Sequence, residues 1–542
     1  MAALEKILDL VAGYVWGAPL LLLLFGTHLF LTFRLRFIQR SIGKAIRLSL
    51  ERSQEGEGDI SQFGALTTAL AATIGTGNIV GVATAIAAGG PGAVLWMWLT
   101  GVFGIATKYA EALLSVKFRI TTPAGQMAGG PMYVLERGMN ARWLGWIFAL
   151  LTAVAAFGIG NMVQANSIAT MLHDTWGVPT YASGIVIAVL TAVVVLGGIK
   201  WISAACEALV PFMAISYVLG CLVLLIMHAG RIPDSIVLIV TSAFSGTALT
   251  GGFLGAGVAQ AIRFGIARGL FSNESGLGSA PIVAAAAQTR NAVRQALVSS
   301  TGTFWDTVVV CAMTGLVIVN SQSWLLSEIP MNTLPASLQA TVTASPAFQH
   351  GGLDFGKAPA DLRSALLQAG AWKTVTVLPE GFPEAIREPA SAAGALQKDV
   401  LTVASLPADL LAPLAAAEGW RPPSMGGGVL TKTAFADIPT IGPIVLSLGL
   451  LTFVFSTILG WEYYGEKAAE YLLGSRVILP YRILWVVSVL VGSTVTLKAV
   501  WAFADIANGL MAIPNLVSLI VLNRVIVAET RKYLWEDRLD EA

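Results

Sequence analysis

The sequence predicts an all-α polytopic membrane protein. Hydrophobic residues make up 55% of the 542 residues, and charged residues make up only 12%. Soluble domains carry about 25% charged residues, so roughly half of the charge that a soluble chain needs is missing. Apolar stretches of about 20 residues, each long enough to cross a bilayer as a helix, recur along the chain. Together these two observations predict many transmembrane helices.

Eleven membrane-spanning segments are predicted from the apolar stretches. They lie near residues 12–33, 61–88, 91–116, 143–171, 180–198, 207–228, 252–288, 295–319, 438–464, 479–497 and 499–522. The first segment lacks the basic leading region and the small-residue cleavage site of a signal peptide, so we expect it to be a permanent helix.

The distribution of Lys and Arg predicts the orientation in the membrane. If the first helix runs from outside to inside, the predicted cytoplasmic segments hold 20 of these residues, whereas the short outer segments hold only Lys6, Arg231 and Lys498. By the positive-inside rule, the N-terminus lies outside and the C-terminus lies in the cytoplasm. The expected location is the plasma membrane, which is the inner membrane in a bacterium.

Charge and cysteine usage exclude several classes of function. The formal net charge of +1 supplies no field that would attract nucleic acid. Cys206, Cys221 and Cys311 lie in apolar runs and the histidines are scattered, so neither a disulfide framework nor a zinc pattern is available. The chain has no GxxxxGK[ST] phosphate-binding loop. We therefore expect no ATP, no transition metal and no intramembrane enzyme chemistry.

A long mixed interval divides the chain into parts. Residues 1–320 form the N-terminal transmembrane part, residues 321–437 an insert, residues 438–522 the remaining helices and residues 523–542 a cytoplasmic tail. The orientation places the insert outside. Its pattern predicts amphipathic helices at 362–369 and 407–418 and a strand at 371–378. It shows no catalytic constellation, so an extracytoplasmic cap or partner surface is the favoured interpretation.

The second predicted span contains residues that disfavour a continuous helix. Gly75, Thr76, Gly77 and Asn78 lie halfway along it, and three of these four favour turns over helix interiors. Backbone groups freed at bilayer depth are costly unless they face protein, water or a ligand. We therefore expect the helix to open and to offer N–H groups to a carboxylate and carbonyls to a monovalent cation. The alternative is that these glycines only permit close helix packing.

A second interruption is predicted in the seventh span, at Gly269–Pro281. Most of these residues are Gly, Ser, Asn, Glu or Pro, which is too polar for a lipid-facing span. Counted after the opening helix, the two interruptions fall in spans 1 and 6 of ten. Corresponding interruptions in two halves are the best sequence indication of a transporter site at an inverted-repeat interface. Glu274 either caps the following half-helix or takes part in coupling or gating.

Polar side chains in other spans are further candidates. Asp306 lies near mid-span, where an ionisable group is expensive, and it either supports a cation site or serves as a hydrogen-bonded strut. Gln164 offers an amide to a ligand or to a neighbouring helix. Ser456 and Thr457 place hydroxyls on the helix turn that precedes Trp461, where they either ligate a hard cation or bond back to their own helix.

Three glutamates lie near predicted cytoplasmic ends: Glu111, Glu207 and Glu462. Interfacial solvation or pairing with a nearby cation is the favoured interpretation for them. Lys108 is the predicted partner of Glu111, and Lys467 is the predicted partner of Glu462.

The run Gly89–Gly104 is similar to the signature of the alanine or glycine:cation symporter family, also called the sodium:alanine symporter family. Further runs resemble motifs of this family in the same order: Gly75–Ala83, Gly129–Tyr133, Gly269–Glu274, Gly460–Glu466 and Asn508–Leu516. The resemblance covers nearly the whole chain apart from the insert. Leu95 stands where the signature usually has Phe, a change that we interpret as packing only.

The resemblance implies a LeuT-type fold, in which one extra helix precedes two inverted five-helix repeats. It implies Na+-driven uptake of a small neutral amino acid, alanine or glycine, with Na+ as coupling ion and no other cofactor. By position, the main-chain N–H groups of Thr76 and Gly77 would bind the amino acid carboxylate. The residues lining the pocket would be Gln164, Ser272, Asn273, Thr457 and Trp461.

For sodium, the resemblance implies four ligand positions: the carbonyls of Ala71 and Ile74 and the hydroxyls of Ser456 and Thr457. A second cation site is expected near Thr73 and Asn78, with help from the seventh helix. The implied mechanism is alternating access, in which Na+ holds the opened helix against the helix that bears Ser456 and Thr457.

The competing class is a channel whose broken helices line a continuous pore. A channel predicts large currents without a solute requirement. The sequence leaves open whether Na+ or H+ is coupled, and whether alanine or glycine, and which stereoisomer of alanine, is preferred.

Overall fold

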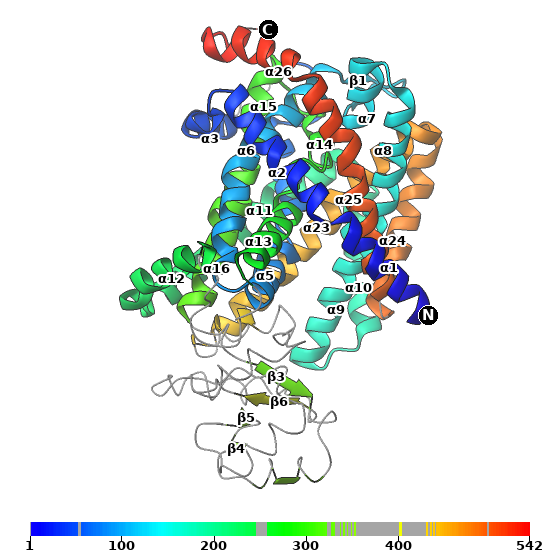
Figure 1. The fold of residues 1–542 in the computed structure, drawn as a ribbon. Coiled ribbons are helices and arrows are strands. Elements are labelled where there is room, and N and C mark those ends of the chain that lie inside the picture. The colour runs from blue at the N-terminus through cyan, green and yellow to red at the C-terminus, as the bar shows by residue number, and fades with distance from the viewer. Residues whose placement is uncertain are drawn as a thin grey trace.

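The structure is a computed structural model. It describes residues 2–51, 56–244, 257–321, 327–330, 337, 340–341, 344, 348–349, 352–353, 400–403, 430–431, 434–435, 437–438, 441–495 and 498–541. A bundle of long helices forms the main body, and a small sheet lies beyond one end of it (Figure 1). The C-terminus lies at the end of the bundle opposite the sheet, and the N-terminus lies toward the sheet-bearing end (Figure 1).

The N-terminal helix is interrupted once. The predicted span 12–33 contains parts of α1 (Ala2–Val15) and α2 (Ala18–Arg34), which are separated at Trp16 and Gly17. Pro19 in the first turn of α2 has no N–H to satisfy, so it suits this restart. The short α3 (Ile42–Leu50) follows outside the span.

The first half of the bundle contains two helices with π-helical segments. Its elements are α4 (Gln62–Thr73), η2 (Gly77–Gly81), α5 (Val82–Gly89), α6 (Ala93–Lys117), α8 (Arg142–Ala155), η4 (Ala156–Met162), α9 (Val163–Trp176), α10 (Thr180–Val195) and α11 (Ile199–Met227). Between α6 and α8 lie the hairpin of β1 (Ile120–Thr121) and β2 (Met127–Ala128), the single turn α7 (Pro131–Tyr133) and η3 (Val134–Gly138).

The second half begins with the peripheral helix α12 (Ile232–Phe244). It continues with α13 (Gly257–Asn273), α14 (Pro281–Ala284), α15 (Ala292–Thr303), η6 (Phe304–Cys311), α16 (Ala312–Asn320), α23 (Ile441–Leu473), α24 (Ile478–Thr494), α25 (Lys498–Val521), α26 (Asn523–Thr530) and η11 (Arg531–Trp535). Each of the eleven predicted spans therefore contains helix, although several boundaries differ. For example, α11 begins at Ile199 instead of 207, and α23 continues to Leu473 instead of 464.

Seven of the described helices are long and apolar enough to cross a membrane, or eight if α4 and α5 count as one bent span. The predicted number was eleven. Helices α6, α10 and α13 account for the difference: α10 has 16 residues, α13 has 17, and α6 carries Lys108 and Glu111 in its interior. A span that is enclosed by other helices does not need an apolar surface on every side, so apolarity alone undercounts such spans.

A four-stranded sheet is the part of the insert that the structure describes as regular. Its strands are β3 (Ser327–Pro330), β4 (Phe348–Gln349), β5 (Gly352–Leu353) and β6 (Val400–Val403), in the order β3-β6-β5-β4. β3 pairs with β6 antiparallel, with Ile329 opposite Leu401, and β5 pairs with β6 in parallel. The helices predicted at 362–369 and 407–418 and the strand predicted at 371–378 lie outside the described residues.

The interrupted helices lie inside the bundle. α4 packs against α11, α15 and α23, and α6 packs against α2, α13 and α15. The outer helices α10 and α24 instead expose apolar side chains such as Val186, Val189 and Leu484. This is the arrangement expected when the outer surface faces lipid and the costly backbone interruptions are enclosed by protein.

Close packing between α4 and α23 makes Gly460 sensitive to substitution. A Cβ atom at Gly460 would lie 2.8 Å from the Cβ of Ala72 and 2.9 Å from the carbonyl oxygen of Thr68. We expect Gly460→Ala to push the helices apart and to lower the free energy of unfolding by about 1–3 kcal/mol, measured as a lower thermal unfolding temperature in detergent. Gly26→Ala is the matched control, because nothing lies within 4 Å of a Cβ there. Equal unfolding temperatures for the two variants would contradict this packing.

Candidate functional site

The second predicted span is interrupted at residues 74–76, called here the first break. α4 ends at Thr73, Ile74 is extended with ψ of 97°, and the two half-helices differ in direction by 51°. The side-chain oxygen of Asn78 accepts a hydrogen bond of 2.9 Å from the freed N–H of Gly75. The predicted opening is thus confirmed, and Asn78 compensates part of its backbone cost. Thr76 and Gly77 begin the following half-helix, whose first N–H groups lack partners within the helix.

The seventh span is interrupted at residues 274–280, called here the second break. α13 ends at Asn273, and φ is positive at Glu274 (55°), Gly276 (93°) and Gly278 (87°). A Cβ at Gly278 would lie 2.7 Å from Pro131 Cγ, so this left-handed position also lacks room for a side chain. The Glu274 carboxylate accepts a 2.5 Å hydrogen bond from the Ser279 hydroxyl. No side chain caps the N-terminus of α14, so the capping role considered for Glu274 is not seen.

The two breaks meet, and Asp306 links them. A Cβ placed on Gly77 would lie 3.3 Å from Ser272 Cα, so the chain at the first break touches α13 directly. The buried Asp306 carboxylate accepts hydrogen bonds from the Asn78 amide (2.6 Å) and from the Ser272 hydroxyl (3.0 Å). The Thr307 hydroxyl donates a third at 2.6 Å. Asp306 is therefore a hydrogen-bonded strut; a contribution to cation binding stays a prediction.

The four predicted sodium ligands lie together at the seam between α4 and α23. The Ser456 hydroxyl oxygen lies 3.3 Å from the carbonyl oxygen of Ala71, and that of Thr457 lies 3.5 Å from the carbonyl oxygen of Ile74. Both hydroxyls also lie 2.9 Å from the carbonyl oxygen of Phe453 in their own helix. Neutral carbonyl and hydroxyl oxygens are suitable ligands for a hard cation.

Gln164 and Trp461 lie on neighbouring elements. The Trp461 side chain packs directly on Gly160, where any Cβ would clash with the indole. Gln164 follows Gly160 by one helical turn, so both positions share a face. The Gln164 amide nitrogen donates to the Ile159 carbonyl at 2.8 Å, whereas its buried amide oxygen has no hydrogen-bond partner in the described part of the chain. An unpartnered buried acceptor beside an aromatic wall suits the ammonium group of a small ligand.

The sequence profile of the sodium:alanine symporter family matches residues 1–350 and 399–542. The chain belongs to the sodium:alanine symporter family. It is 43% identical over 535 residues to the sodium/alanine symporter of Methanococcus maripaludis, with 97% of each chain covered. It is 42% identical to an uncharacterized transporter of Haemophilus influenzae (98% of this chain, 96% of the relative). It is 28% identical to a probable sodium/glutamine symporter of Bacillus subtilis (98% and 91%).

A mutant of the Eremococcus coleocola manganese transporter is a structural match, with a TM-score of 0.33, 13% identity and 89% and 97% of the two chains covered.

Membership of the sodium:alanine symporter family makes the chain a multi-pass membrane protein and a sodium-coupled amino acid symporter by family, not an enzyme.

The two residues predicted for a second cation site make hydrogen bonds with nearby groups. The Thr73 hydroxyl donates to Ala69 and Leu70 of its own helix, at 3.1 and 3.3 Å. The Asn78 side chain is engaged by Gly75 and Asp306. The described contacts do not decide whether these two residues bind a cation, because a hydroxyl that donates its proton still offers its oxygen, so the second cation site stays a prediction.

The two pocket residues predicted on α13 are also engaged. The Ser272 hydroxyl is directed to Asp306. The Asn273 oxygen accepts from the Ser275 N–H at 2.9 Å, while its amide nitrogen is buried without a partner in the described part of the chain.

The pairing predicted for Glu111 is wrong. The Glu111 carboxylate accepts from the Gly276 N–H at 3.0 Å and from the Asn515 amide at 2.6 Å, so it supports the second break instead of pairing with Lys108. The Asn508–Leu516 motif contained Asn515, but nothing in its spacing indicated this partner.

The pairing predicted for Glu462 is also wrong. Its carboxylate lies 4.0 Å from Arg482, whereas Lys467 pairs with Glu470 at 2.8 Å. The Glu207 carboxylate accepts a hydrogen bond from the Ser61 hydroxyl at 3.2 Å, and the solvation predicted for it at the membrane interface stays a prediction. Sequence reasoning also missed Cys311, whose sulfur lies 3.3 Å from the Asn78 amide and 3.2 Å from the Ser272 hydroxyl.

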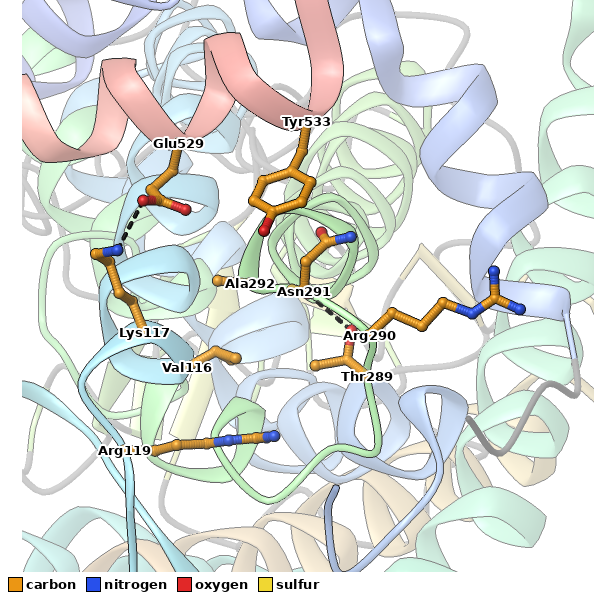
Figure 2. Close-up of a pocket in the computed structure, with 9 residues that line it drawn as sticks. All are labelled: Val116, Lys117, Arg119, Thr289, Arg290, Asn291, Ala292, Glu529 and Tyr533. Carbon is orange, nitrogen blue, oxygen red and sulfur yellow. Dashed lines mark hydrogen bonds and ion pairs between the residues drawn. The ribbon is translucent and has the colours of Figure 1, made fainter. Parts of the chain in front are cut away.

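A cavity of about 220 Å³ opens away from the breaks, at the ends of α6, α15 and α26 (Figure 2). Its lining residues are Val116, Lys117, Arg119, Thr289, Arg290, Asn291, Ala292, Glu529 and Tyr533. Its charges are already engaged: Lys117 pairs with Glu529 at 2.6 Å, as Figure 2 shows, and Arg119 donates to main-chain carbonyls. We assign no substrate to this cavity, because none of the predicted site residues lines it.

Replacement of Asp306 tests the link between the breaks. Asp306→Asn keeps the size of the side chain but turns one acceptor into a donor that faces the Asn78 amide and the hydroxyls of Ser272 and Thr307. A buried donor without an acceptor costs about 1–3 kcal/mol. We expect a clear fall in thermal unfolding temperature of the purified protein. An unchanged unfolding temperature would show that Asp306 does not hold the breaks together.

Proposed function

We propose that this protein is a secondary symporter that imports a small neutral amino acid, alanine or glycine, together with Na+ by alternating access. The proposed arrangement is of the LeuT type, in which one extra N-terminal helix precedes two inverted five-helix repeats that begin at α4 and at α13. Breaks in the first and sixth helices of such a set agree with this arrangement. The proposed setting is the plasma membrane, with the N-terminus outside, the C-terminus in the cytoplasm and the insert on the outer side.

One observation carries the proposal of sodium binding. Each hydroxyl has a single proton, which can reach only one of its two neighbouring carbonyls. The shorter contact is with Phe453 in both cases, at 2.9 Å. The Ser456 oxygen then faces the Ala71 carbonyl oxygen with no proton between them, and Thr457 faces Ile74 in the same way. A cation placed among these oxygens would replace repulsion with attraction.

The amino acid is proposed to bind beside this seam. The N–H groups of Thr76 and Gly77, which have no partner within the described half-helix, suit its carboxylate, as the N-terminus of a half-helix suits an anion. The Gln164 amide oxygen would accept a hydrogen bond from the ammonium group of the amino acid. The other residues proposed to line the pocket are Thr457, Ser272 and Asn273. Trp461 limits the size of the side chain, which favours alanine or glycine over larger amino acids.

Coupling follows from the position of the proposed ion. Na+ would join α4 to α23 and so hold the first break in a fixed position. The amino acid would bind at the first break in that position. Loss of Na+ to the cytoplasm would loosen α4 and release the substrate. One charge crossing a potential of 100 mV is worth about 2.3 kcal/mol, to which the Na+ gradient adds, so no phosphoryl chemistry is needed.

Uptake into proteoliposomes tests the proposal. We expect labelled alanine to accumulate when a Na+ gradient is imposed and not when K+, Li+ or H+ gradients replace it. Inhibition of this uptake by unlabelled glycine, D-alanine, glutamine or leucine then shows which amino acids the pocket accepts. Accumulation driven by H+ alone would move the coupling ion from Na+ to H+. Large currents in the absence of any amino acid would favour a channel instead.

Replacement of Thr457 tests the proposed Na+ ligand without changing the shape of the side chain. Thr457→Val keeps the branched shape but removes the oxygen beside Ile74, so we expect Na+-dependent alanine uptake to fall to background. Thr452→Val is the matched control: Thr452 lies on the same helix, and its hydroxyl donates to Leu448 of that helix at 2.8 Å. We expect this control to retain uptake.

Asn78→Ala is expected to abolish uptake as well, because it removes both the acceptor for Gly75 and the donor to Asp306. Undiminished uptake in both Thr457→Val and Asn78→Ala would remove these assignments.

A further inference from the structure

The chain that leads into α4 is bonded to the chain that follows α14. The N–H groups of Asp59 and Ile60 both donate to the Ala286 carbonyl, at 2.7 and 3.2 Å, and the Gln288 N–H donates to the Ile60 carbonyl at 2.8 Å. A Cβ at Gly58 would clash with the Gln288 nitrogen, so no side chain fits between the two segments at this point. These bonds join the segment before the first break to the segment after the second break.

The Arg119 side chain bridges the same two segments. Arg119 lies between α6 and β1, and its guanidinium group donates to the Ala285 and Ala287 carbonyls, at 3.0 and 2.8 Å, after α14. It also donates to the Glu57 carbonyl, at 2.7 Å, before α4. A guanidinium group presents several N–H donors in a rigid fork, which an ammonium group lacks. Arg119 is therefore suited to hold carbonyls of two segments at once.

The β1–β2 hairpin adds two further contacts. The Met127 N–H donates to the Asp59 carboxylate at 2.8 Å, which ties the hairpin to the chain before α4. The Gln126 amide oxygen accepts a hydrogen bond from Lys467 of α23 at 2.9 Å. Residues 119–128 are called here the inner lock. They join the chain before α4, the chain after α14 and α23, at the end of the bundle opposite the sheet of the insert (Figure 1).

We infer that the inner lock keeps the cytoplasmic end of the transport path closed, with Arg119 as the residue that positions the two segments against each other. This inference rests on the proposed function and deepens it, because alternating access requires the beginning of α4 to separate from the chain after α14. The bonds from Arg119 to Glu57 and from Met127 to Asp59 break in that movement. None of the carbonyls to which Arg119 donates belongs to a proposed ligand of Na+ or of the amino acid.

The inner lock and the proposed sodium site hold α4 at different places. The proposed sodium ligands on α4 lie next to the first break, whereas Glu57 and Asp59 precede the first residue of α4, Gln62. Hydrogen bonds from a charged donor are stronger than those between neutral groups. Departure of Na+ therefore leaves the inner lock as a separate restraint, whose strength sets how readily this end of the protein opens.

The buried thiol of Cys206 reports the position of α4. α4 packs closely on α11, since a Cβ at Gly64 would clash with the Ser203 hydroxyl and the Glu207 carboxylate. Cys206 follows Ser203 by three residues on α11 and is fully buried, so it lies on the face that α4 covers. Separation of the beginning of α4 from its neighbours would give a water-soluble reagent access to this thiol.

Replacement of Arg119 tests the inference in inside-out membrane vesicles. A maleimide that does not cross the bilayer is added at a constant high Na+ concentration, the protein is purified, and peptide masses identify which cysteine has reacted. We expect Cys206 to react roughly tenfold faster in Arg119→Met than in the unmodified protein, because the hydrogen bonds that keep this end closed are lost. We expect no change at Cys221, which lies about 22 Å farther along α11.

Three results would overturn the inference. The first is an unchanged reaction rate of Cys206 in the folded variant. The second is an equal increase at Cys221, which would show a general loosening of the protein instead of opening at one end. The third is a faster reaction of Cys206 in right-side-out vesicles only, which would place the lock on the outer side of the membrane.

Companion variants separate the bridging geometry from the charge. Arg119→Lys keeps the charge but not the forked donors, so we expect Cys206 to react faster in this variant too, and the unmodified rate would overturn the bridging role. Arg142→Met is the matched control, because Arg142 is an exposed cation at the start of α8, and it should leave the rate unchanged. If Arg119→Met does not fold, Asp59→Ala decides by the same criteria, because it removes the acceptor for the Met127 N–H.

Uptake of labelled alanine by the same variants separates this inference from the proposed function. We expect Arg119→Met to show a higher KM for external alanine, because a smaller fraction of the protein has its inner end closed. Na+-driven uptake by the unmodified protein, together with an unchanged Cys206 rate in Arg119→Met, would overturn the inference alone. Absence of Na+-driven uptake by the unmodified protein would overturn the proposed function itself.

Discussion

The hydrogen bonds to Asp306 are the interaction on which the rest of the structure depends. Opening a helix at membrane depth frees backbone groups that neither water nor lipid can satisfy. The Asn78 side chain compensates part of this cost, because its oxygen accepts a hydrogen bond from the freed Gly75 N–H. Its nitrogen donates to the Asp306 carboxylate at the same time. Ser272 brings the end of α13 to the same carboxylate. The residue that compensates the first break thus also attaches it to the second.

The breaks divide the contacts of each interrupted helix into two groups. α5, after the first break, packs with α13, before the second. Asn78 in η2, which leads into α5, and Ser272 in α13 both donate to Asp306. α4 packs with α14, and the chain just before α4 is bonded to the chain after α14: the Asp59 N–H donates to the Ala286 carbonyl at 2.7 Å and the Gln288 N–H donates to the Ile60 carbonyl at 2.8 Å. The segment after one break therefore packs with the segment before the other break, and this crosswise pairing holds for both breaks.

The sequence predicted the positions of both breaks, because the residues that disfavour a helix act locally: Gly75, Gly77 and Asn78 in one case, Gly276 and Gly278 in the other. The sequence did not predict side-chain partners that lie on a different helix. Glu111 was paired with Lys108 because they are neighbours on one helix, yet Glu111 binds Gly276 on another. The same error affected Glu462, and enclosed helices such as α6 made apolarity a poor guide to the number of spans. Spacing along a helix specifies a shared face, but only the fold specifies what that face meets.

In the proposed cycle, the crosswise pairing decides which part of the protein can respond to Na+. The Asp306 group contains no proposed sodium ligand except through Asn78, whose side chain is already engaged, so α5, α13 and η6 should stay together whether Na+ is bound or not. α4 is different, because Ala71 and the Ile74 that follows it meet Ser456 and Thr457 across a seam where hydroxyl and carbonyl oxygens face one another. Loss of Na+ would leave that seam repulsive while the Asp306 group remained attractive. The proposed ion therefore acts on a connection of the first break that the chain does not satisfy by itself, and a ligand that favours one arrangement of such a connection shifts the protein toward it.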